Sequence, residues 1–309
     1  MDKAAFAPWR KLFLLCLYTA LVTGAWVWWQ GRKTLDADGL LQTLPEERMV
    51  RAYVDLKLLR SAGFLDVLAG SKTPLEPEYL AFIKATGFDY RTDLEAVAAG
   101  FADERTYIAA RGRFDWVRLA AYAKTQGGSC QGTNCQMPGS QPKRNISFAP
   151  LRPDVLALAV TPEPGGALAI FLGKWKNPPR IPTTPLWVSA PGSMFSDAAA
   201  LPDGSRAFFS PLAQTSHADF KLSPSPNGFS LDLLGTCLTP AACQEVAGQL
   251  TKITELLRKM LARDNLKPPP ADLSSVLTGG EFSAQESSVI GRWPMDRTFL
   301  DKLVADRLP

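Results

Sequence analysis

The chain has 309 residues, of which 46% are hydrophobic and 21% charged, and it is long enough for two ordinary domains. These values are near globular averages and exclude a chain that is disordered, collagen-like or coiled-coil throughout. Residues 1–33 hold five of the 34 basic and one of the 30 acidic residues, so they carry the whole net charge of +4. The rest of the chain is neutral, which argues against nucleic-acid binding. Because His217 is the single histidine, His-rich metal centres and paired-histidine catalysis are excluded too.

Residues 12–29 give the strongest signal in the sequence, an apolar run of eighteen residues without a charge. As a helix this run spans about 27 Å, which matches the hydrocarbon core of a membrane. Tryptophan rings belong at the headgroup level, and they flank the run at both ends. The tryptophans concerned are Trp9, Trp26, Trp28 and Trp29. The sequence thus predicts a transmembrane helix that these four side chains anchor in the lipid bilayer.

The flanks of this run predict the topology. A cleaved signal peptide is the alternative, but the apolar run continues through bulky residues beyond its only small-residue cleavage site, at 23–25. Lysine and arginine before the run outweigh those after it, which favours a cytoplasmic N-terminus. We therefore expect a cytoplasmic tail over 1–11, a stalk over 30–47, and periplasmic domains of a single-pass bacterial inner-membrane protein.

Four cysteines follow the membrane segment in two local pairs. Cys130 and Cys135 lie in a Gly- and Ser-rich loop, whereas Cys237 and Cys243 flank the passage from a strand to a helix. An even number of cysteines at short spacings beyond an export signal predicts disulfides in an oxidising compartment. Two alternatives stay open: free thiols, and a four-thiolate zinc site whose second arm is wider than structural zinc sites use.

Alternation of apolar and polar residues predicts the elements of a first exported domain, 48–176. The expected strands are 49–59, 94–102, 105–114, 145–151, 154–162 and 166–175, with a tight turn at Asp103-Glu104. The expected helices follow residue 76 and the N-cap Asp115. Four prolines in 177–185 then predict a linker.

A second domain, 186–309, follows the linker. Its expected strands are 185–190, 205–223, 229–237 and 287–293, and its expected helices are 193–201, 240–263 and a C-terminal one. Helix 240–263 combines the cap Thr239 with Pro240 at its first position. Its apolar stripe consists of Val246, Leu250, Ile253, Leu257 and Leu261, which we interpret as a core face.

The fold class expected from these elements is α+β, with two domains that each pack helices on one face of an antiparallel sheet. Residues 107–124 and 287–306 share an order of strand, Gly-Arg-aromatic, capping Asp and amphipathic helix. This echo favours an internal duplication, although generic strand-to-helix chemistry is the alternative.

Three features together carry a resemblance: the segment 50–63 (VRAYVDLKLLRSAG), the Gly-Arg-aromatic-Asp turn at 112–115, and the closing segment 289–303 (VIGRWPMDRTFLDKL). With the membrane anchor, their order resembles uncharacterised bacterial envelope proteins that have one span and tandem ferredoxin-like exported domains. The resemblance covers most of the chain and implies that fold, but its motifs are structural and imply no catalytic residues. The architecture is also similar to that of secretion and pilus assembly-platform proteins.

The sequence contains no recognised catalytic signature, and it predicts neither a cofactor nor a metal site. Residues 63–73 lack the spacing of a phosphate-binding loop. His217 adjoins Ser216 on a predicted strand, where successive side chains face opposite ways, so we interpret it as a surface histidine rather than part of a triad. The one compact basic-aromatic patch is a candidate contact with anionic headgroups or a partner, with an ordinary strand end as the alternative. The patch consists of Lys174, Trp175, Lys176 and Arg180.

We therefore expect a membrane-anchored extracytoplasmic protein that binds or scaffolds an envelope protein partner without catalysis. The alternatives are an envelope enzyme without a recognisable motif, for example a Ser/Lys-type hydrolase, and an assembly-platform component. A buried polar cluster in a pocket would favour the enzyme, whereas a broad apolar surface patch would favour the scaffold.

Overall fold

The fold is known from a computed structural model in which residues 37–309 form one compact unit, distinct from residues 1–36. The structure describes residues 34–46, 48–61, 77–139, 142–173, 181, 183–196, 206–226, 228–265 and 268–306. The predicted membrane helix with its four tryptophans, the loop 63–73 and the basic-aromatic patch lie outside these residues. Within them, no helix is both long enough and apolar enough to cross a membrane.

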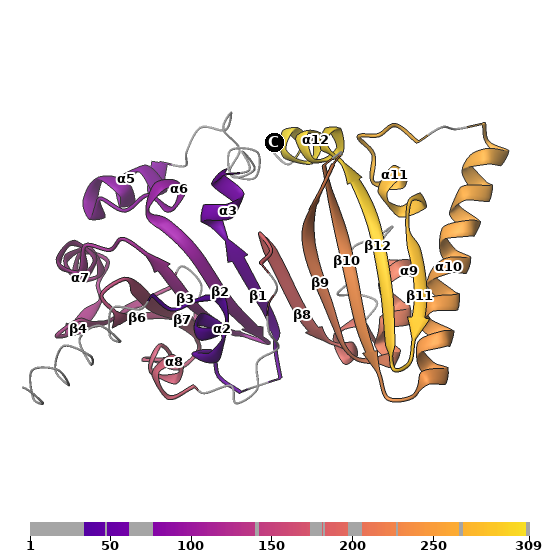
Figure 1. Ribbon diagram of the computed structural model, residues 1–309. Helices are drawn as coiled ribbons and strands as arrows, with labels where there is room; N and C mark the ends of the chain where they lie inside the picture. The colour runs from indigo at the N-terminus through magenta and orange to yellow at the C-terminus, as the bar shows by residue number, and fades with distance from the viewer. Residues whose placement is uncertain are drawn as a thin grey trace, which may run out of the picture. The chain divides into compact units, whose positions relative to one another are not determined.

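Twelve strands form one antiparallel sheet (Figure 1), in the order β11-β12-β10-β9-β8-β1-β2-β3-β7-β6-β5-β4. The strands are β1 (Val50–Asp55), β2 (Leu94–Ala102), β3 (Arg105–Gly112), β4 (Ser129–Gln131), β5 (Asn134–Pro138), β6 (Asn145–Arg152), β7 (Val155–Thr161), β8 (Leu186–Pro191), β9 (Thr215–Ser225), β10 (Gly228–Cys237), β11 (Glu281–Gln285) and β12 (Ser288–Asp296). The α+β class is therefore confirmed. The expected pair of separate sheets is wrong, because both predicted blocks contribute to a single sheet.

The two blocks join where β8 pairs with β1. Val54 lies opposite Leu186 and Ala52 lies opposite Val188, while the other edge of β1 pairs with β2. An unpaired edge strand exposes a row of backbone donors and acceptors, and this pairing satisfies them for the leading strand of each block. The sheet thus continues across the Pro-rich segment that was expected to separate two domains.

The two blocks repeat one strand order. In the first, β1, β2 and β3 are followed across the sheet by β7 and β6; in the second, β8, β9 and β10 are followed by β12 and β11. In the ferredoxin-like fold, another strand separates the strands that a helix connects. Here β1 adjoins β2, and β8 adjoins β9, so the ferredoxin-like expectation is wrong. By this order, β3 corresponds to β10, rather than to β12 as the sequence echo indicated.

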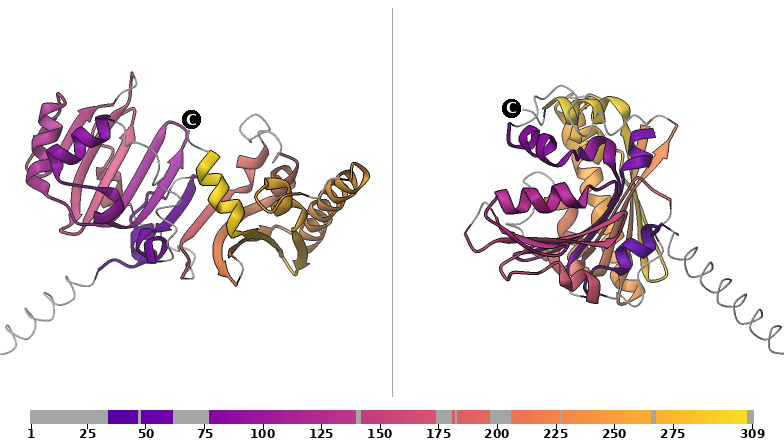
Figure 2. Two further views of the ribbon diagram at one scale, coloured as in Figure 1. Left: turned by 90° about the horizontal axis from the view of Figure 1, so that it is seen from above. Right: turned by 90° about the vertical axis from the view of Figure 1, so that its left-hand side faces the viewer.

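Helices pack on both faces of the sheet. They are α2 (Ala37–Gln42), α3 (Leu56–Ser61), α5 (Pro77–Thr86), α6 (Tyr90–Asp93), α7 (Trp116–Thr125), α8 (Leu168–Leu172), α9 (Arg206–Phe209), α10 (Pro240–Arg263), α11 (Leu273–Thr278) and α12 (Arg297–Asp306), with short 3-10 turns η1 (Gly192–Ser196) and η3 (Ser210–Gln214). Residues directly opposite each other in a ladder share a face. Val54, Val97, Ala110 and Leu156 follow one another across β1, β2, β3 and β7, and this row links the cores beneath α10 and α7. In the first block, α2 and α8 cover the opposite face, as Figures 1 and 2 show.

Part of the expected stalk belongs to the folded unit. Residues 37–42 form α2, and Leu40, Leu41 and Leu44 are fully buried. The expected stalk over 30–47 is therefore wrong for residues 37–44. Removing the three leucine side chains from water stabilises the fold, so this segment packs on the sheet rather than extending as a polar spacer.

Two expected strands are helical. The third strand of the meander, 166–175, is replaced by α8, where Ile170 is buried and the Ala167 N–H donates to Ser147 Oγ. Residues 206–214 form α9 and η3 before β9 begins at Thr215. Short apolar runs have no helical or strand period, so packing against the sheet decides their structure.

Helix α10 begins and ends as predicted, and Thr239 Oγ1 accepts a hydrogen bond from the Ala242 N–H. Val246 and Leu250 are fully buried, as the core interpretation requires. Ile253 and Leu257 of the stripe are partly buried and pack against the same core, whereas Leu256 and Met260, which lie outside the stripe, are 60% and 48% exposed. The core interpretation is therefore confirmed from Val246 to Leu257, and Leu261 is only partly buried.

Candidate functional site

A hollow lies on the face of β8–β12 opposite α10. It is a cavity of about 790 Å³, and every strand from β8 to β12 contributes to its wall. Helices α10 and α11 pack on the other face, against a core that includes Leu233, Val289 and Trp293. Because side chains alternate along a strand, the residues between these core positions point into the cavity.

A row of charged side chains crosses the floor of the cavity from strand to strand. Trp187 lies opposite Lys221, Lys221 opposite Asp232, Asp232 opposite Arg292, and Arg292 opposite Glu281. Neighbours of opposite charge stabilise a sheet, whereas like charges directly opposite destabilise it. The alternation of signs from Lys221 to Glu281 therefore fits the register.

Asp232 is the centre of this row and is only 7% exposed. Its carboxylate accepts hydrogen bonds from Ser223 Oγ at 2.7 Å, Ser230 Oγ at 3.2 Å and Arg292 Nε at 2.9 Å, and Lys221 Nζ lies 3.8 Å away. Burial favours the neutral acid, but the donors from Ser223 and Arg292 prevail and hold the pKa of Asp232 below its usual value. This carboxylate is satisfied by the protein and positions the two cations.

Asp219 has a different environment on the neighbouring row, between Ser189 and Leu234. Its Oδ1 atom is buried and has no hydrogen-bond partner in the described part of the chain. Burial raises the pKa of this carboxyl group, against a hydrogen bond from Ser189 and the charge of His217. Asp219 therefore lines the cavity and holds a buried acceptor that no described group satisfies.

Apolar side chains adjoin these charges. Leu234 and Ile290 lie opposite each other on β10 and β12 and are 46% and 37% exposed, whereas Trp187 is buried at the β8 end. The cavity thus combines exposed apolar side chains with fixed charged groups, and this combination is typical of ligand sites.

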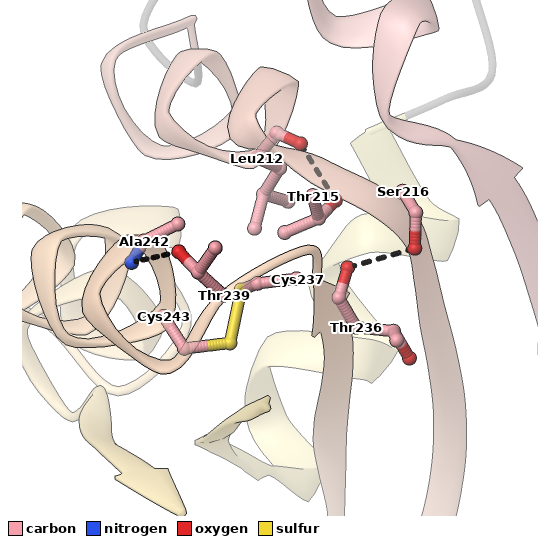
Figure 3. Close-up of a disulfide and its surroundings, with 8 residues drawn as sticks. All are labelled: Leu212, Thr215, Ser216, Thr236, Cys237, Thr239, Ala242 and Cys243. Atoms are coloured by element: carbon pink, nitrogen blue, oxygen red, sulfur yellow. Dashed lines mark hydrogen bonds between the residues drawn. A yellow bond between two sulfur atoms is a disulfide. The ribbon is translucent and has the colours of Figure 1, made fainter. Parts of the chain in front are cut away.

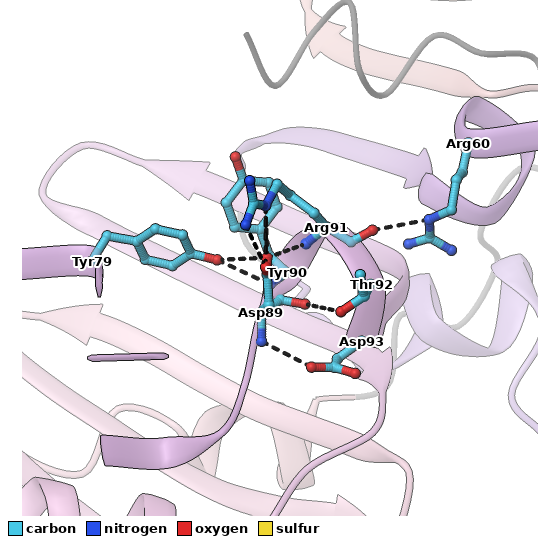
Figure 4. Close-up of polar contacts among 7 residues, drawn as sticks. All are labelled: Arg60, Tyr79, Asp89, Tyr90, Arg91, Thr92 and Asp93. Carbon is cyan, nitrogen blue, oxygen red and sulfur yellow. Dashed lines mark hydrogen bonds and ion pairs between the residues drawn. The ribbon is translucent and has the colours of Figure 1, made fainter. Parts of the chain in front are cut away.

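Polar side chains also gather in the first block, around Asp89 (Figure 4). Asp89 accepts hydrogen bonds from Tyr79 Oη at 3.1 Å and from the Arg91 backbone and guanidinium, and Arg60 Nε donates to the Arg91 carbonyl oxygen at 2.9 Å. Hydrogen bonding from Arg91 lowers the pKa of Asp89, and burial raises the pKa of Tyr79 to about 12. These bonds tie α3, α5 and α6 together, so this cluster has a structural role.

Both predicted disulfides are present. Cys130 and Cys135 lie opposite each other in the β4–β5 hairpin, and Cys237 at the end of β10 is joined to Cys243 in α10 (Figure 3). Because all four sulfur atoms are bonded in pairs, the zinc-site and free-thiol alternatives are wrong. Disulfides persist in oxidising compartments, so the folded unit is extracytoplasmic.

The interpretation of His217 as a surface histidine is confirmed, since its side chain is exposed. Ser216 Oγ donates to the Thr236 carbonyl oxygen, and alternation places Ser216 and His217 on opposite faces of β9. Ser189 hydrogen-bonds to Asp219, whereas a hydrolytic triad requires the serine to bond to the histidine. Across the described residues, no three of His, Cys, Asp and Glu are grouped as metal ligands.

Sequence reasoning did not identify the cavity residues as a site. The two-residue spacing of Asp219 and Lys221 on a predicted strand is the one local signal that could have grouped them, and Arg292 lies within the Gly-Arg-aromatic echo. Asp232 becomes their neighbour only through the register of β9, β10 and β12. The pairing of β9 with β10 is local, because a short hairpin joins them, but the pairing of Asp232 with Arg292 joins positions 60 residues apart and no local pattern specifies it.

No family model matches the chain, and no curated protein matches it either. Solved structures of a protein designated TP0453 are similar to it. Crystal form I has a TM-score of 0.49 and 10% sequence identity, and covers 89% of this chain and 99% of that chain. Forms III and IV have the same TM-score with 9% identity, and cover 89% of this chain and 98% of theirs. The similarity is distant and assigns no family.

Proposed function

We propose that this chain is a membrane-anchored extracytoplasmic binding protein that holds its ligand or partner in the cavity on β8–β12. The observation that supports this most directly is the exposure of Leu234 and Ile290 beside the fixed carboxylates Asp219 and Asp232. Exposed apolar side chains in a concave surface with few polar groups are typical of binding sites.

Two details favour binding over a Ser/Lys-type hydrolase at this place. Such an enzyme needs a lysine amine within hydrogen-bond reach of a serine hydroxyl. In the described part of the chain, the partner of Lys221 Nζ is the carboxylate of Asp232. Ser189, the serine beside Asp219, bonds to that carboxyl group instead.

The membrane anchor is part of the same proposal. It comprises a single inner-membrane span at 12–29 with Trp9, Trp26, Trp28 and Trp29 at its ends, the N-terminus in the cytoplasm, and headgroup contacts from the basic-aromatic patch at 174–180. The charge bias of residues 1–11 supports this orientation, and the two disulfides agree with it.

The topology can be tested by cysteine labelling. Pro269 is exposed on the folded unit, so Pro269→Cys should react with a membrane-impermeant maleimide once the outer membrane is permeabilised. A cysteine introduced at Asp2 should react only after lysis. Labelling of the Pro269→Cys variant only after lysis would contradict the proposed orientation.

The binding face can be tested by photo-crosslinking in cells. A benzophenone amino acid at Leu234 or Ile290 should form discrete adducts, because both positions line the cavity. Val117 on α7 is 80% exposed and lies outside the cavity, which makes it the matched control. Adducts should disappear from position 234 when Ile290→Glu is added. Equal adducts at all three positions, or none at 234 and 290, would reject this face as the binding site.

A further inference from the structure

The proposed binding cavity has charged groups that fit one class of ligand. We propose that it binds a short peptide with free ends, the amino group at Asp219 and the carboxylate at Arg292. This inference rests on the proposed function and specifies its ligand.

The amino end is assigned from the unsatisfied atom of Asp219. A buried acceptor without a donor costs free energy, which a ligand N–H recovers on binding. Asp219 lines the cavity, and its buried Oδ1 atom is such an acceptor, to which no described group donates. An ammonium group offers three donors and a positive charge, and therefore also favours the ionised carboxylate.

The carboxylate end is assigned from the remaining donors of Arg292. Its Nε atom is held by Asp232 Oδ1 at 2.9 Å, which fixes the guanidinium plane. No described residue accepts from its two Nη groups, and its side chain is 66% exposed. Guanidinium groups bind carboxylates through two parallel hydrogen bonds. Arg292 is fixed at Nε and still has its Nη donors, so it suits a terminal carboxylate.

The distance between these groups determines the length of the peptide. Asp219 on β9 and Arg292 on β12 are separated by β10, and their rows differ by two residues. With strands about 4.8 Å apart and about 3.4 Å per residue, the two Cα positions lie about 12 Å apart. An extended chain spans at most about 3.5 Å per residue, so three residues cover about 10.5 Å, and the length of the Arg292 side chain covers the remainder. Leu234 lies between the two ends and would contact the central side chain.

Two other charged residues line the cavity, and each is a weaker partner for an end of the peptide. Glu281 is exposed and lies opposite Arg292, but a solvated carboxylate gains little from an ammonium group. Lys221 is already directed at Asp232. The desolvated Asp219 therefore makes the stronger contact for the amino end.

The test is calorimetric titration of the full chain in a non-ionic detergent with the tripeptide Ala-Leu-Ala. We expect saturable binding that weakens at least tenfold when the peptide is N-acetylated, and also when it is C-amidated. In Asp219→Asn, free and acetylated peptides should bind equally; in Arg292→Gln, free and amidated peptides should bind equally. Glu255→Gln, at an exposed position of α10 on the other face of the sheet, is the matched control and should bind like the parent.

The outcomes separate this inference from the proposed function. Thermal melts establish that each variant is folded before titration. No binding of Ala-Leu-Ala, or binding that ignores both end modifications, overturns the peptide inference. If crosslinks at Leu234 persist in that case, the binding function stands with a different ligand. If Glu281→Gln rather than Asp219→Asn removes the effect of acetylation, the placement of the amino end is wrong.

Discussion

Two aspartates on adjacent strands show how hydrogen-bond donors decide the properties of a carboxyl group. Asp232 and Asp219 both lie in the cavity wall, and burial opposes the ionisation of each. Asp232 receives donors from Ser223, Ser230 and Arg292, and its pKa falls. Asp219 has one buried oxygen without a described donor, and its pKa rises. The first therefore stabilises the fold at neutral pH, and the second destabilises it.

Asp219→Asn tests the second part of this statement. The raised pKa means that the folded protein prefers the neutral acid, so the contribution of this group to stability is complete below about pH 4 and is lost as the pH rises through the folded pKa. The Asn variant, which is always neutral, should melt above the parent at pH 8, and the difference should vanish at pH 3.5. Thermal unfolding followed by circular dichroism between these pH values measures it. A parent that melts higher than the variant at pH 8 would contradict the expectation.

Asp232→Asn should have the opposite pH dependence. Its lowered pKa means that the ionised form stabilises the fold above about pH 4, and that this contribution is lost as the pH falls through the folded pKa. The substitution removes hydrogen bonds to a charged group and should lower the free energy of unfolding by about 1.5–3 kcal/mol at pH 7. Urea titrations at pH 7 and pH 3 measure both values. Glu281→Gln, in the same row but exposed, should change the free energy by less than about 0.5 kcal/mol.

At the scale of elements, α10 combines two kinds of surface in one helix. Val246 and Leu250 are fully buried against the sheet, whereas Leu256 and Met260 are about half exposed towards the C-terminal end. The apolar stripe itself becomes less buried in the same direction, since Leu257 and Leu261 are only partly buried. The sheet beneath the helix determines where the core ends.

Leucine and methionine substitutions along α10 should separate these surfaces. Leu250→Ala should lower the free energy of unfolding by about 2–5 kcal/mol, because it empties a fully buried site. Met260→Ala and Lys252→Ala should change it by less than about 0.5 kcal/mol, since their side chains are exposed. Leu257→Ala should fall between these values. Denaturant titrations of the four variants measure the gradient, and equal effects at 250 and 260 would contradict it.

The disulfide at the start of α10 should contribute measurably to stability. Cys237 and Cys243 are both buried and close a loop with a sequence separation of 6. In the chain-entropy model, closing a loop of this size stabilises the fold by about 2 kcal/mol. In urea titrations, the free energy of unfolding of the Cys237→Ser, Cys243→Ser double variant should be lower than that of the parent by about this amount. The matched double variant at Cys130 and Cys135 closes a similar loop and should lose a similar amount, unless the effect is enthalpic rather than entropic.

At the scale of the whole molecule, one sheet and one core connect the two blocks. The core beneath α10 includes Leu56 and Leu59 of α3, and Val54 of β1 packs against it. A boundary at the Pro-rich segment would therefore divide a continuous core. We expect the chain to unfold in one transition, rather than as two independent domains.

Comparison of spectroscopic probes tests this expectation. Far-UV circular dichroism and tryptophan fluorescence should give coincident urea transitions for the full chain in detergent. Val54→Asp, at the β1–β8 junction, should shift both transitions together. Two separate midpoints, with only one shifted by the substitution, would indicate independent domains.

The sequence predicts local elements well and their assembly poorly. Helix α10, the β2–β3 hairpin, the terminal strand and both disulfides follow from caps, periods and spacings that lie within about 25 residues of each other. The burial of Leu40 and Leu44, the single sheet and the contact of Asp232 with Arg292 depend on elements far apart in the chain; 60 residues separate Asp232 from Arg292. Periodicity reports which face of an element is apolar, but not which other element covers it.

The pairing of β1 with β8 has a consequence for biosynthesis. Its partners, such as Arg51 and Ser189, are separated by 138 residues. At about 5–20 residues per second, a ribosome needs roughly 7 to 28 seconds to deliver the second partner after the first. During that interval the free edge of β1 is open to pairing with other chains. The charged side chains of Arg51 and Asp55 lie on that strand, where they oppose such aggregation until β8 emerges.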